Sequence, residues 1–534
     1  MRKRYLSMIM AAMMAASALA GCSGGSESST AASGAASGTT ASTGESSEES
    51  GEKKTITAIS FERGKCAASE GTMEDNRWTR WIDENAPVNV EWVPIPRTES
   101  VAKTNALFAS GSAPDLVWEF NKGFMNNLLA QGVLQPLDEH IENYSTSYKA
   151  YLENHPELKP YVTSDSDGLM YAFTSARTQL SVANHGMWIR QDWLDALNLE
   201  TPTTMEELDN VLHQFTTGDP DGNGVDDTFG LGFNYNLKGI VKALYGGYEM
   251  MVVDGTLVDW ATTDAYVDYL TQMKKWYTDG VIDPEYITDT NYERQRQLVV
   301  TGKTGTYFAG WDCSAEWREL KQNLPEAELV PLESVETSYG KFGCYQEPPA
   351  NMIVCMNAEA SDPEACVQFI DWLIEGNWEP LKHGFEGEHY QLVDGYRQVI
   401  DQDKNTLEIG YSNEYALVAD ETIDDIETYM KVTAAQDELS QEYAPIRALG
   451  LETQLKNTYR RDLPALPSTD LNIKYNSEFS ASFEELEDRC ITDPSYSVEQ
   501  CIQDMNDLRD SLGFDEVMAE YQAWYDENKD NLDM

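Results

Sequence analysis

The segment from Asp219 to Asp227 has the residue types and the spacing of a calcium-binding loop. Oxygen ligands fall at loop positions 1, 3, 5, 7 and 9, supplied in turn by Asp219, Asp221, Asn223, the backbone carbonyl of Val225, and Asp227. Gly224 stands at position 6, where such loops turn sharply. Position 12 is Gly230, so the usual glutamate is missing and another residue must close the shell. The spacing favours a structural calcium ion; an acidic turn without metal is the alternative.

A second chemistry, lipid attachment, is indicated near the N-terminus. A basic start and an apolar run from Tyr5 to Ala20 are typical of a secretory signal. Cys22 directly follows Leu19-Ala20-Gly21, a sequence that resembles the bacterial lipobox, whose cysteine is acylated through sulfur with a fatty acid such as palmitate. We expect a signal peptide over 1–21 and a lipid anchor on the extracellular face of the cell membrane. An ordinary cleaved signal is the alternative, and a membrane-spanning helix would need about 20 apolar residues.

The stretch 22–53 is predicted to be a disordered linker that starts at the lipidated cysteine. From Ser23 to Glu52 it contains only Ser, Gly, Ala, Thr and Glu. Such a composition buries too little apolar surface to offset the entropy cost of ordering the chain. A flexible coil of this length reaches roughly 30 Å root-mean-square, so it would hold a folded body away from the membrane.

The chain is strongly acidic, with a formal net charge of -53. Nucleic acids and anionic membranes both need a basic surface, so this charge argues against them as partners. The acidic residues are spread along the chain, which favours a role in solubility. Besides Cys22 there are seven cysteines without the spacing of a metal site. Cys490 and Cys501 are close enough in sequence to pair, but we expect mostly buried thiols.

Strands and helices alternate along the rest of the chain. The β-rich stretches are 55–61, 88–93, 113–118, 168–173, 187–190, 303–308 and 352–355. Helical patterns cover 78–85, 100–110, 191–197, 203–215, 261–279 and 363–375, and the chain is mostly helical from 436 onward. This alternation predicts an α/β fold of βαβ units with a parallel sheet. The length after the linker indicates two or three domains.

Aromatic residues beside charged residues follow several of these strands. Flat aromatic faces stack on the C–H groups of sugars, carboxylates bond to sugar hydroxyls, and open α/β sheets bind ligands beyond the carboxyl ends of their strands. The candidate ligand residues are Phe61, Glu62, Arg63, Trp118, Glu119, Trp311, Asp312, Tyr345 and Glu347. Core packing is the alternative for every aromatic residue in this set.

Several segments together resemble the extracellular solute-binding lipoproteins of ABC importers, the maltose-binding-protein-like group, and most of all its long Gram-positive branch associated with oligosaccharides. They are the lipobox, Gly111–Trp118, Trp188–Asp195, Thr201–Thr204, Asp219–Gly224, Asp279–Glu285, Thr301–Gly305 and Gly384–Tyr390. The resemblance rests on the order of these segments across nearly the whole mature chain.

The resemblance implies a type II periplasmic-binding-protein-like fold, in which two α/β lobes close on a ligand around a hinge. Lobe 1 is expected over 54–183 with a return over about 347–400. Lobe 2 is expected over 184–346, completed by a helical region over about 401–534. The resemblance also implies a monomer that works with membrane permease subunits and a cytoplasmic ATPase. The sequence has no GxxxxGK[ST] loop, so the chain would not power transport itself.

The function indicated is capture of a small solute, an oligosaccharide above all, for delivery to an importer. A surface enzyme that degrades polysaccharides is the alternative from another class, and a binding protein for peptides or other solutes is the alternative within the same class. A glycosidase needs two carboxylates at a fixed separation, and among 91 acidic residues a neighbouring pair carries no information. The sequence also lacks an HExxH zinc motif. We therefore expect no catalysis and no catalytic cofactor.

Replacing Cys22 with Ala should release the protein into the medium or leave its signal uncleaved, because the acceptor for the lipid is lost. Membrane fractionation and the mass of the N-terminal peptide measure this outcome. An unchanged membrane fraction with an unchanged N-terminal mass would contradict lipid attachment at Cys22.

Overall fold

The first sheet is five-stranded and mixed. The computed structural model describes residues 53–529, apart from 121, 165, 248–249, 419–422, 464–465 and 468. The strands of this sheet, in spatial order, are β2 (Asn89–Pro96), β1 (Thr55–Glu62), β3 (Leu116–Glu119), β13 (Ala350–Met356) and β4 (Ala172–Ala176). Strand β1 runs parallel to β2 and β3, whereas β13 is antiparallel to both of its neighbours.

The second sheet is four-stranded and also mixed. Its spatial order is β10 (Leu329–Leu332), β5 (Gly186–Arg190), β9 (Thr304–Ala309) and β6 (Phe229–Gly232). Strand β5 is antiparallel to β9 and β10, and only β6 and β9 run parallel. The prediction of a parallel sheet is therefore wrong for both sheets. The antiparallel strand β13 lies far along the chain from its partners, and local alternation cannot show which way such a returning strand enters a sheet.

Helices cover the first sheet from the N-terminal part of the chain and from the segment after β13. Strand β2 contacts α1 and α2, whereas α14 contacts α4, α5 and β1. The helices of this region are α1 (Arg77–Asn85), α2 (Ser100–Ala109), α3 (Lys122–Ala130), α4 (Asp138–Tyr144), α5 (Ser147–Asn154), α6 (Lys159–Val162), α14 (Pro363–Trp372), α15 (Trp378–His383) and α16 (Gln402–Glu408), with the hairpin β14 (Tyr390–Val393) and β15 (Tyr396–Val399).

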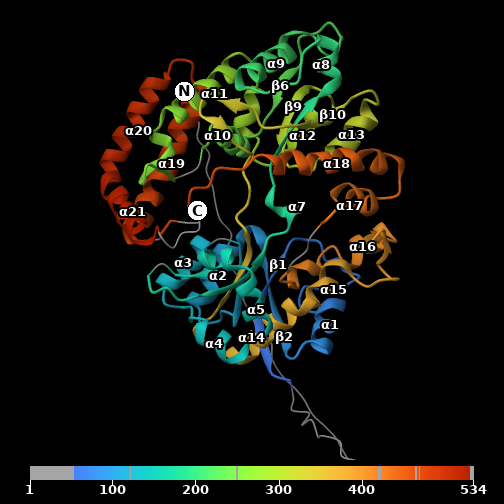
Figure 1. Ribbon diagram of the computed structural model, residues 1–534, viewed down its shortest axis with the longest axis vertical. Coiled ribbons are helices and arrows are strands. Elements are labelled where there is room, and N and C mark those ends of the chain that lie inside the picture. Colours follow the sequence, from blue (N-terminus) through green and yellow to red (C-terminus); the bar gives the residue numbers. More distant parts are fainter. Residues whose placement is uncertain are drawn as a thin grey trace, which may run out of the picture. The chain divides into compact units, whose positions relative to one another are not determined.

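The second sheet has its own helices, and the last helices of the chain join them (Figure 1). Helix α19 contacts α11, α20 and α21, and α18 contacts β10. The elements of this region are α7 (Gln179–Val182), α8 (Gln191–Leu197), α9 (Met205–Thr217), α10 (Lys238–Leu244), β7 (Met250–Val253), β8 (Thr256–Asp259), α11 (Asp264–Thr278), α12 (Glu293–Val300), α13 (Ser314–Asn323), β11 (Glu336–Thr337), β12 (Gly340–Lys341), α17 (Ile426–Thr433), α18 (Glu438–Lys456), α19 (Asp470–Thr492), α20 (Val498–Leu512) and α21 (Phe514–Asn528).

Local sequence signals explain where several helices begin. At α9, Thr204 is the N-cap: its side chain accepts a hydrogen bond from the backbone N–H of Glu207, and the Glu207 carboxylate accepts from the Thr204 backbone. This capping box satisfies donors that the first turn leaves unpaired. Asn76 caps α1 in the same reciprocal way with Thr79.

Each sheet has its own hydrophobic core. The first core includes residues of β1 to β4, β13 and α14, and the second includes residues of β5, α9, α11 and α20. The first core continues to Val418, beyond the predicted end of the lobe 1 return at about 400. The core extends this far because Tyr411 and Tyr415 are buried beside α1 and β2. The ring of Tyr415 lies edge-on to the ring of Trp92. The other lobe limits stay predictions.

The stretches after β4 and before β13 each lead from a strand of one sheet to a strand of the other. Hydrogen bonds join these two stretches to each other and to a further stretch of chain. Arg177 after β4 donates its backbone N–H to Pro349 O at 2.7 Å, and Glu347 donates to Val182 O at 2.8 Å. The third stretch follows α18. Its contacts are Gly343 N–H to Thr458 O at 2.9 Å and the Arg461 guanidinium to Gln346 O at 2.6 Å. Backbone that passes from one sheet to the other is thus bonded at several points.

The predicted signal peptide and Cys22 lie outside the described residues, as does the linker up to Glu52. Within the described part of the chain, no helix combines the length and the apolar character that crossing a membrane requires. All seven cysteines of this part are free thiols, and every one except Cys66 is buried, as expected from the sequence.

Candidate ligand-binding site

The loop from Asp219 to Asp227 folds as a tight, exposed turn between α9 and β6. Its oxygen-bearing side chains lie close together: Asn223 Nδ2 donates to Asp221 Oδ2 at 2.8 Å and to Asp227 Oδ1 at 3.2 Å. The Asp219 carboxylate accepts the N–H of Gly224 at 3.0 Å. Gly224 has a φ of 74°, in the left-handed region that favours glycine. The structure therefore brings together the side chains that the spacing predicts as ligands.

A positive charge already lies among these side chains. Lys303, just before β9, places its ammonium 2.6 Å from an oxygen of Asp227 and 3.3 Å from an oxygen of Asp221. The hydrogen bond from Lys303 lowers the pKa of Asp227, and the bond to Asp227 raises the pKa of Lys303. A metal ion that bound these carboxylates would therefore have to displace the ammonium of Lys303. Gly230 at position 12 lies in β6, and its carbonyl accepts the Thr306 hydroxyl at 2.8 Å, so it does not close the shell.

A cavity of about 1080 Å³ lies among the described residues. It lies against the second sheet's helices and the connecting stretches. Its floor comes from α10, β8 and α11, one wall comes from α19 and α21, and the connecting stretches contribute His185, Tyr345, Pro348, Tyr459 and Arg461. A cavity of this size suits a small ligand.

Aromatic side chains dominate this cavity. Those in its lining are Trp260, Tyr266, Tyr345, Tyr459, Tyr475, Phe479, Phe483, Phe514 and Tyr521. Helix α19 presents three of them because a spacing of four residues puts Tyr475, Phe479 and Phe483 on one face. The ring centroids of Tyr475 and Phe479 are 4.9 Å apart, and those of Phe479 and Phe483 are 4.8 Å apart. A continuous aromatic strip of this kind offers flat apolar faces to a ligand.

A buried ionic cluster supports the floor of the cavity. Glu487 of α19 is 1% exposed and lies 2.8 Å from the Lys242 ammonium and 3.5 Å from the Lys238 ammonium. Hydroxyls of Tyr266 and Tyr269 donate to the same carboxylate at 2.8 and 3.3 Å. Burial works to raise the pKa of Glu487, but the two lysines outweigh it and the pKa is lowered. An ionised, fully bonded carboxylate therefore ties α19 to α10 and α11.

Of the residues predicted from the sequence, only Tyr345 lines this cavity. Its ring lies edge-on to those of Tyr459 at 5.0 Å and His185 at 5.4 Å. Glu347 is close by: one carboxylate oxygen accepts from Asn184 at 2.9 Å, and the other lies 3.8 Å from Arg177. Both residues belong to the connecting stretch, as predicted.

A second group of predicted residues gathers at the carboxyl ends of β1 and β3. The Arg97 guanidinium lies over the rings of Phe61 and Phe120, at 4.9 and 5.1 Å, and 3.3 Å from the Glu119 carboxylate. Arg63 is ion-paired with Glu414 at 2.6 Å.

Glu62 is half-buried beside this group. Its carboxylate accepts the N–H of Gly64 at 2.5 Å. The sheet therefore brings Phe61, Glu62, Arg63 and Glu119 to one edge, although none of them lines the cavity.

The structure places Trp118 and Trp311 in hydrophobic clusters. Trp118 is 1% exposed, and its ring centroid lies 6.4 Å from that of Trp92 in the first core. Trp311 is 7% exposed; its Nε1 donates to Leu180 O at 2.9 Å, and Arg447 covers its ring. Asp312 is bonded to the same arginine at 2.6 Å. Burial of this kind favours core packing over ligand contact for both tryptophans.

The aromatic wall of α19 was not among the residues predicted from the sequence. The spacing of Tyr475, Phe479 and Phe483 was the available signal, because residues four apart share a helix face. It carries little weight alone, since the same spacing is typical of a core-facing helix.

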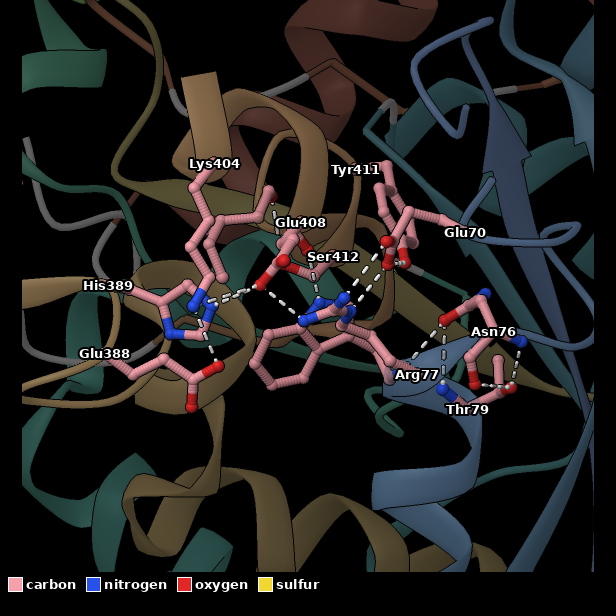
Figure 2. Close-up of polar contacts among 12 residues, drawn as sticks. Glu70, Asn76, Arg77, Thr79, Glu388, His389, Lys404, Glu408, Tyr411 and Ser412 are labelled. Atoms are coloured by element: carbon pink, nitrogen blue, oxygen red, sulfur yellow. Dashed lines mark hydrogen bonds and ion pairs between the residues drawn. The ribbon is translucent and has the colours of Figure 1, made fainter. Parts of the chain in front are cut away.

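A third polar cluster lies near the first core and is shown in Figure 2. Glu388, His389 and Glu408 come close enough to hold a metal ion. However, the Lys404 ammonium lies 3.0 Å from Glu388 and 3.8 Å from Glu408, and Arg77 is ion-paired with Glu408. His389 Nε2 is 3.0 Å from the same carboxylate. These cations neutralise the acids, and through Arg77 and Glu408 the cluster joins α16 to α1.

Residues 82–377 match a protein family described as "Bacterial extracellular solute-binding protein". The chain belongs to this family. The resemblance inferred from the segments is thereby confirmed, and the match covers the whole second sheet and every strand of the first sheet except β1.

Three curated relatives illustrate the family. The chain is 27% identical over 319 residues to the polygalacturonan/rhamnogalacturonan-binding protein YtcQ of Bacillus subtilis (strain 168), covering 57% of this chain and 61% of that protein. It is 25% identical to lipoprotein LipO of the same organism, over 60% of this chain and 64% of LipO. It is 27% identical to the fructooligosaccharide ABC transporter substrate-binding protein FusA of Streptococcus pneumoniae serotype 4, over 49% of this chain and 50% of FusA. The matches thus span half to two thirds of these relatives.

Solved structures share the fold over most of the chain. The alginate-binding protein AlgQ2, solved without calcium ion, aligns with a TM-score of 0.68 at 19% identity, over 89% of this chain and 99% of AlgQ2. An EF-hand mutant of S. pneumoniae FusA in complex with fructo-nystose aligns with a TM-score of 0.65 at 19% identity, over 90% of this chain and all of that one (100%). The periplasmic-binding-protein-like α/β fold predicted from the sequence is confirmed.

Replacing Trp118 with Ala should lower the free energy of unfolding by about 3–5 kcal/mol, because the change leaves a cavity in the core. Trp311→Ala should also destabilise the protein. Denaturant unfolding measures both. Tyr144→Ala is the control, since this ring is 43% exposed and surface changes usually stay within about 0.5 kcal/mol. If Trp118→Ala kept wild-type stability but lost ligand binding, Trp118 would be a ligand-binding residue rather than a core residue.

Proposed function

We propose that this protein is the lipid-anchored solute-binding component of an ABC importer and that it captures an oligosaccharide. The observation that carries the proposal is the aromatic cavity of about 1080 Å³ beside the connecting stretches. Sugars present flat C–H faces that stack on aromatic rings, and polar groups around the rings bond to hydroxyls. YtcQ and FusA, which are named for sugar ligands, support the same class of ligand.

The partners and the anchor belong to the same proposal. Membrane permease subunits would receive the sugar from a monomeric binding protein, tethered through Cys22 to the outer face of the membrane. The lipoprotein LipO supports the tether. Lobe 1 would comprise 54–183 and the return from 347, and lobe 2 would comprise 184–346 and the C-terminal helices. The two lobes would close on the sugar around the connecting stretches.

The protein is proposed to bind its sugar without cleaving it. Family membership supports this, since the family is one of binding proteins. The cavity lining contains the acids Asp259, Glu484 and Glu487. All three are ion-paired with bases: Asp259 with Arg509 at 3.3 Å, Glu484 with Lys238 at 3.7 Å and Glu487 with Lys242 at 2.8 Å. A carboxylate held in this way is poorly placed to attack a glycosidic bond or protonate its oxygen.

Purified protein should show a higher melting temperature with one class of oligosaccharide, because a ligand that binds only the folded state stabilises it by about 2.7 kcal/mol at 100-fold excess over its dissociation constant. A thermal-shift screen of plant, host and microbial oligosaccharides measures this, with peptides as the comparison set. New reducing ends after incubation would favour the enzyme alternative. A shift with peptides alone would contradict the sugar proposal.

Structural calcium is proposed at the loop from Asp219 to Asp227, with ligands from Asp219, Asp221, Asn223, the carbonyl of Val225, and Asp227. The clustering of these side chains in one tight turn supports it, as do the structures of AlgQ2, solved without calcium, and the FusA EF-hand mutant. Calcium would pin the loop between α9 and β6, apart from the cavity, whose lining contains none of these residues.

Calcium should raise the melting temperature of metal-stripped protein, and Lys303→Met should bind calcium several-fold more tightly, because the ion no longer displaces an ammonium. Calorimetric titration with calcium measures both effects. Lys103→Met is the matched control, since this lysine is exposed on α2 beside Glu99. Equal calcium affinity in Lys303→Met and wild type, or no effect of chelator on melting, would contradict calcium at this loop.

A further inference from the structure

Three buried polar atoms in the cavity lining have no hydrogen-bond partner among the described residues. They are Trp260 Nε1, the Tyr475 hydroxyl and His185 Nδ1. Trp260 is 4% exposed and Tyr475 is 6% exposed, so bulk water does not compensate for the missing partners. A buried polar group without a partner is costly, and native proteins rarely keep one without a reason. All three residues line one cavity, so a ligand that enters it is placed beside them.

Together, the three atoms need a ligand group that both donates and accepts hydrogen bonds. Burial lowers the pKa of His185, although Glu347 and a bond to the backbone of Tyr345 oppose the shift, and the imidazole is neutral at pH 7. Since Nδ1 has no partner among the described residues, the bond to the Tyr345 backbone falls to Nε2, which leaves Nδ1 as an acceptor. Trp260 Nε1 only donates, and the Tyr475 hydroxyl does both. A sugar hydroxyl can pair with all three, whereas a carboxylate accepts only and would face the lone pair of His185.

The positive charges of the lining are balanced by its negative charges, so the cavity is not a basic site for anions. The lining holds three acids and three bases, namely Asp259, Glu484 and Glu487 with Lys238, Lys242 and Arg461. Lys238 lies 2.6 Å from Asp488 and 3.5 Å from Glu487, and Lys242 lies 2.8 Å from Glu487. An acidic polysaccharide brings a carboxylate on each uronate unit, into a chain whose formal net charge is already -53. Coulomb repulsion therefore opposes it.

We propose that the cavity binds a neutral oligosaccharide and that Trp260, Tyr475 and His185 form hydrogen bonds with its hydroxyls. This inference rests on the proposed function and narrows it, because the sugar-binding proteins of the family need not share one charge class of ligand. The aromatic strip of α19 would stack the sugar rings while these three residues select their orientation.

Calorimetric titration with two matched panels tests the ligand class. One panel contains neutral fructo-, xylo-, malto- and galacto-oligosaccharides, and the other contains oligogalacturonates and alginate oligomers of equal length. Binding within the neutral panel is expected. Binding of uronates alone would overturn this inference and leave sugar capture standing. Binding of neither panel, with a shift by peptides or other solutes, would overturn the proposed function as well.

Two tyrosine variants test the hydroxyl contact. Tyr475→Phe should weaken binding of the neutral sugar by about tenfold, the equivalent of one lost hydrogen bond, and should melt no lower than wild type. Tyr286→Phe is the matched control, because its hydroxyl is also buried and unpartnered among the described residues but does not line the cavity. It should keep wild-type affinity. Wild-type affinity in both folded variants, or equal losses in both, would overturn the role of Tyr475.

Discussion

Hydrogen bonding between the stretches that connect the two sheets is the constraint on which the rest of the structure depends. The residues after β4 and before β13 are bonded to each other, and the stretch after α18 is bonded to the second of these. The same stretches supply Tyr345, His185, Tyr459 and Arg461 to the cavity lining. A movement of one sheet relative to the other would therefore shift side chains that line the cavity. The proposed ligand site and the connections between the sheets thus share residues, which is what hinge closure on a ligand would require.

The opposite wall of the cavity is held by charge rather than by backbone. Glu487 is buried with two lysines and two tyrosine hydroxyls around it. Removing one partner of such a group would leave an uncompensated charge in a dry environment, which is strongly destabilising. Helix α19 is thus fixed in rotation about its own axis, since only one of its faces carries Glu487 toward α10. That rotation turns the strip of Tyr475, Phe479 and Phe483 toward the cavity.

Local patterns predicted most of the elements and little of their long-range pairing. The strands β1, β2 and β5 and the helix α9 were readable because their patterns depend on near neighbours. The direction of β13 was not, because its partners β3 and β4 lie far away in sequence. Tyr345, a predicted ligand residue, lines the cavity, whereas Trp118 and Trp311 are buried in hydrophobic clusters, because a tryptophan after a strand suits a core as well as a ligand. The aromatic face of α19 could be recognised as a wall of the cavity only from the tertiary fold.

The aromatic wall comes from a different part of the chain than the family match. The matched region ends at residue 377, while α19 and α21 begin at Asp470 and Phe514. Residues beyond the matched region therefore supply about half of the cavity lining, while solved structures share the fold over 89% of this chain. Substitutions on the cavity face of these helices would change the shape of the pocket without altering the two sheets or the stretches that connect them.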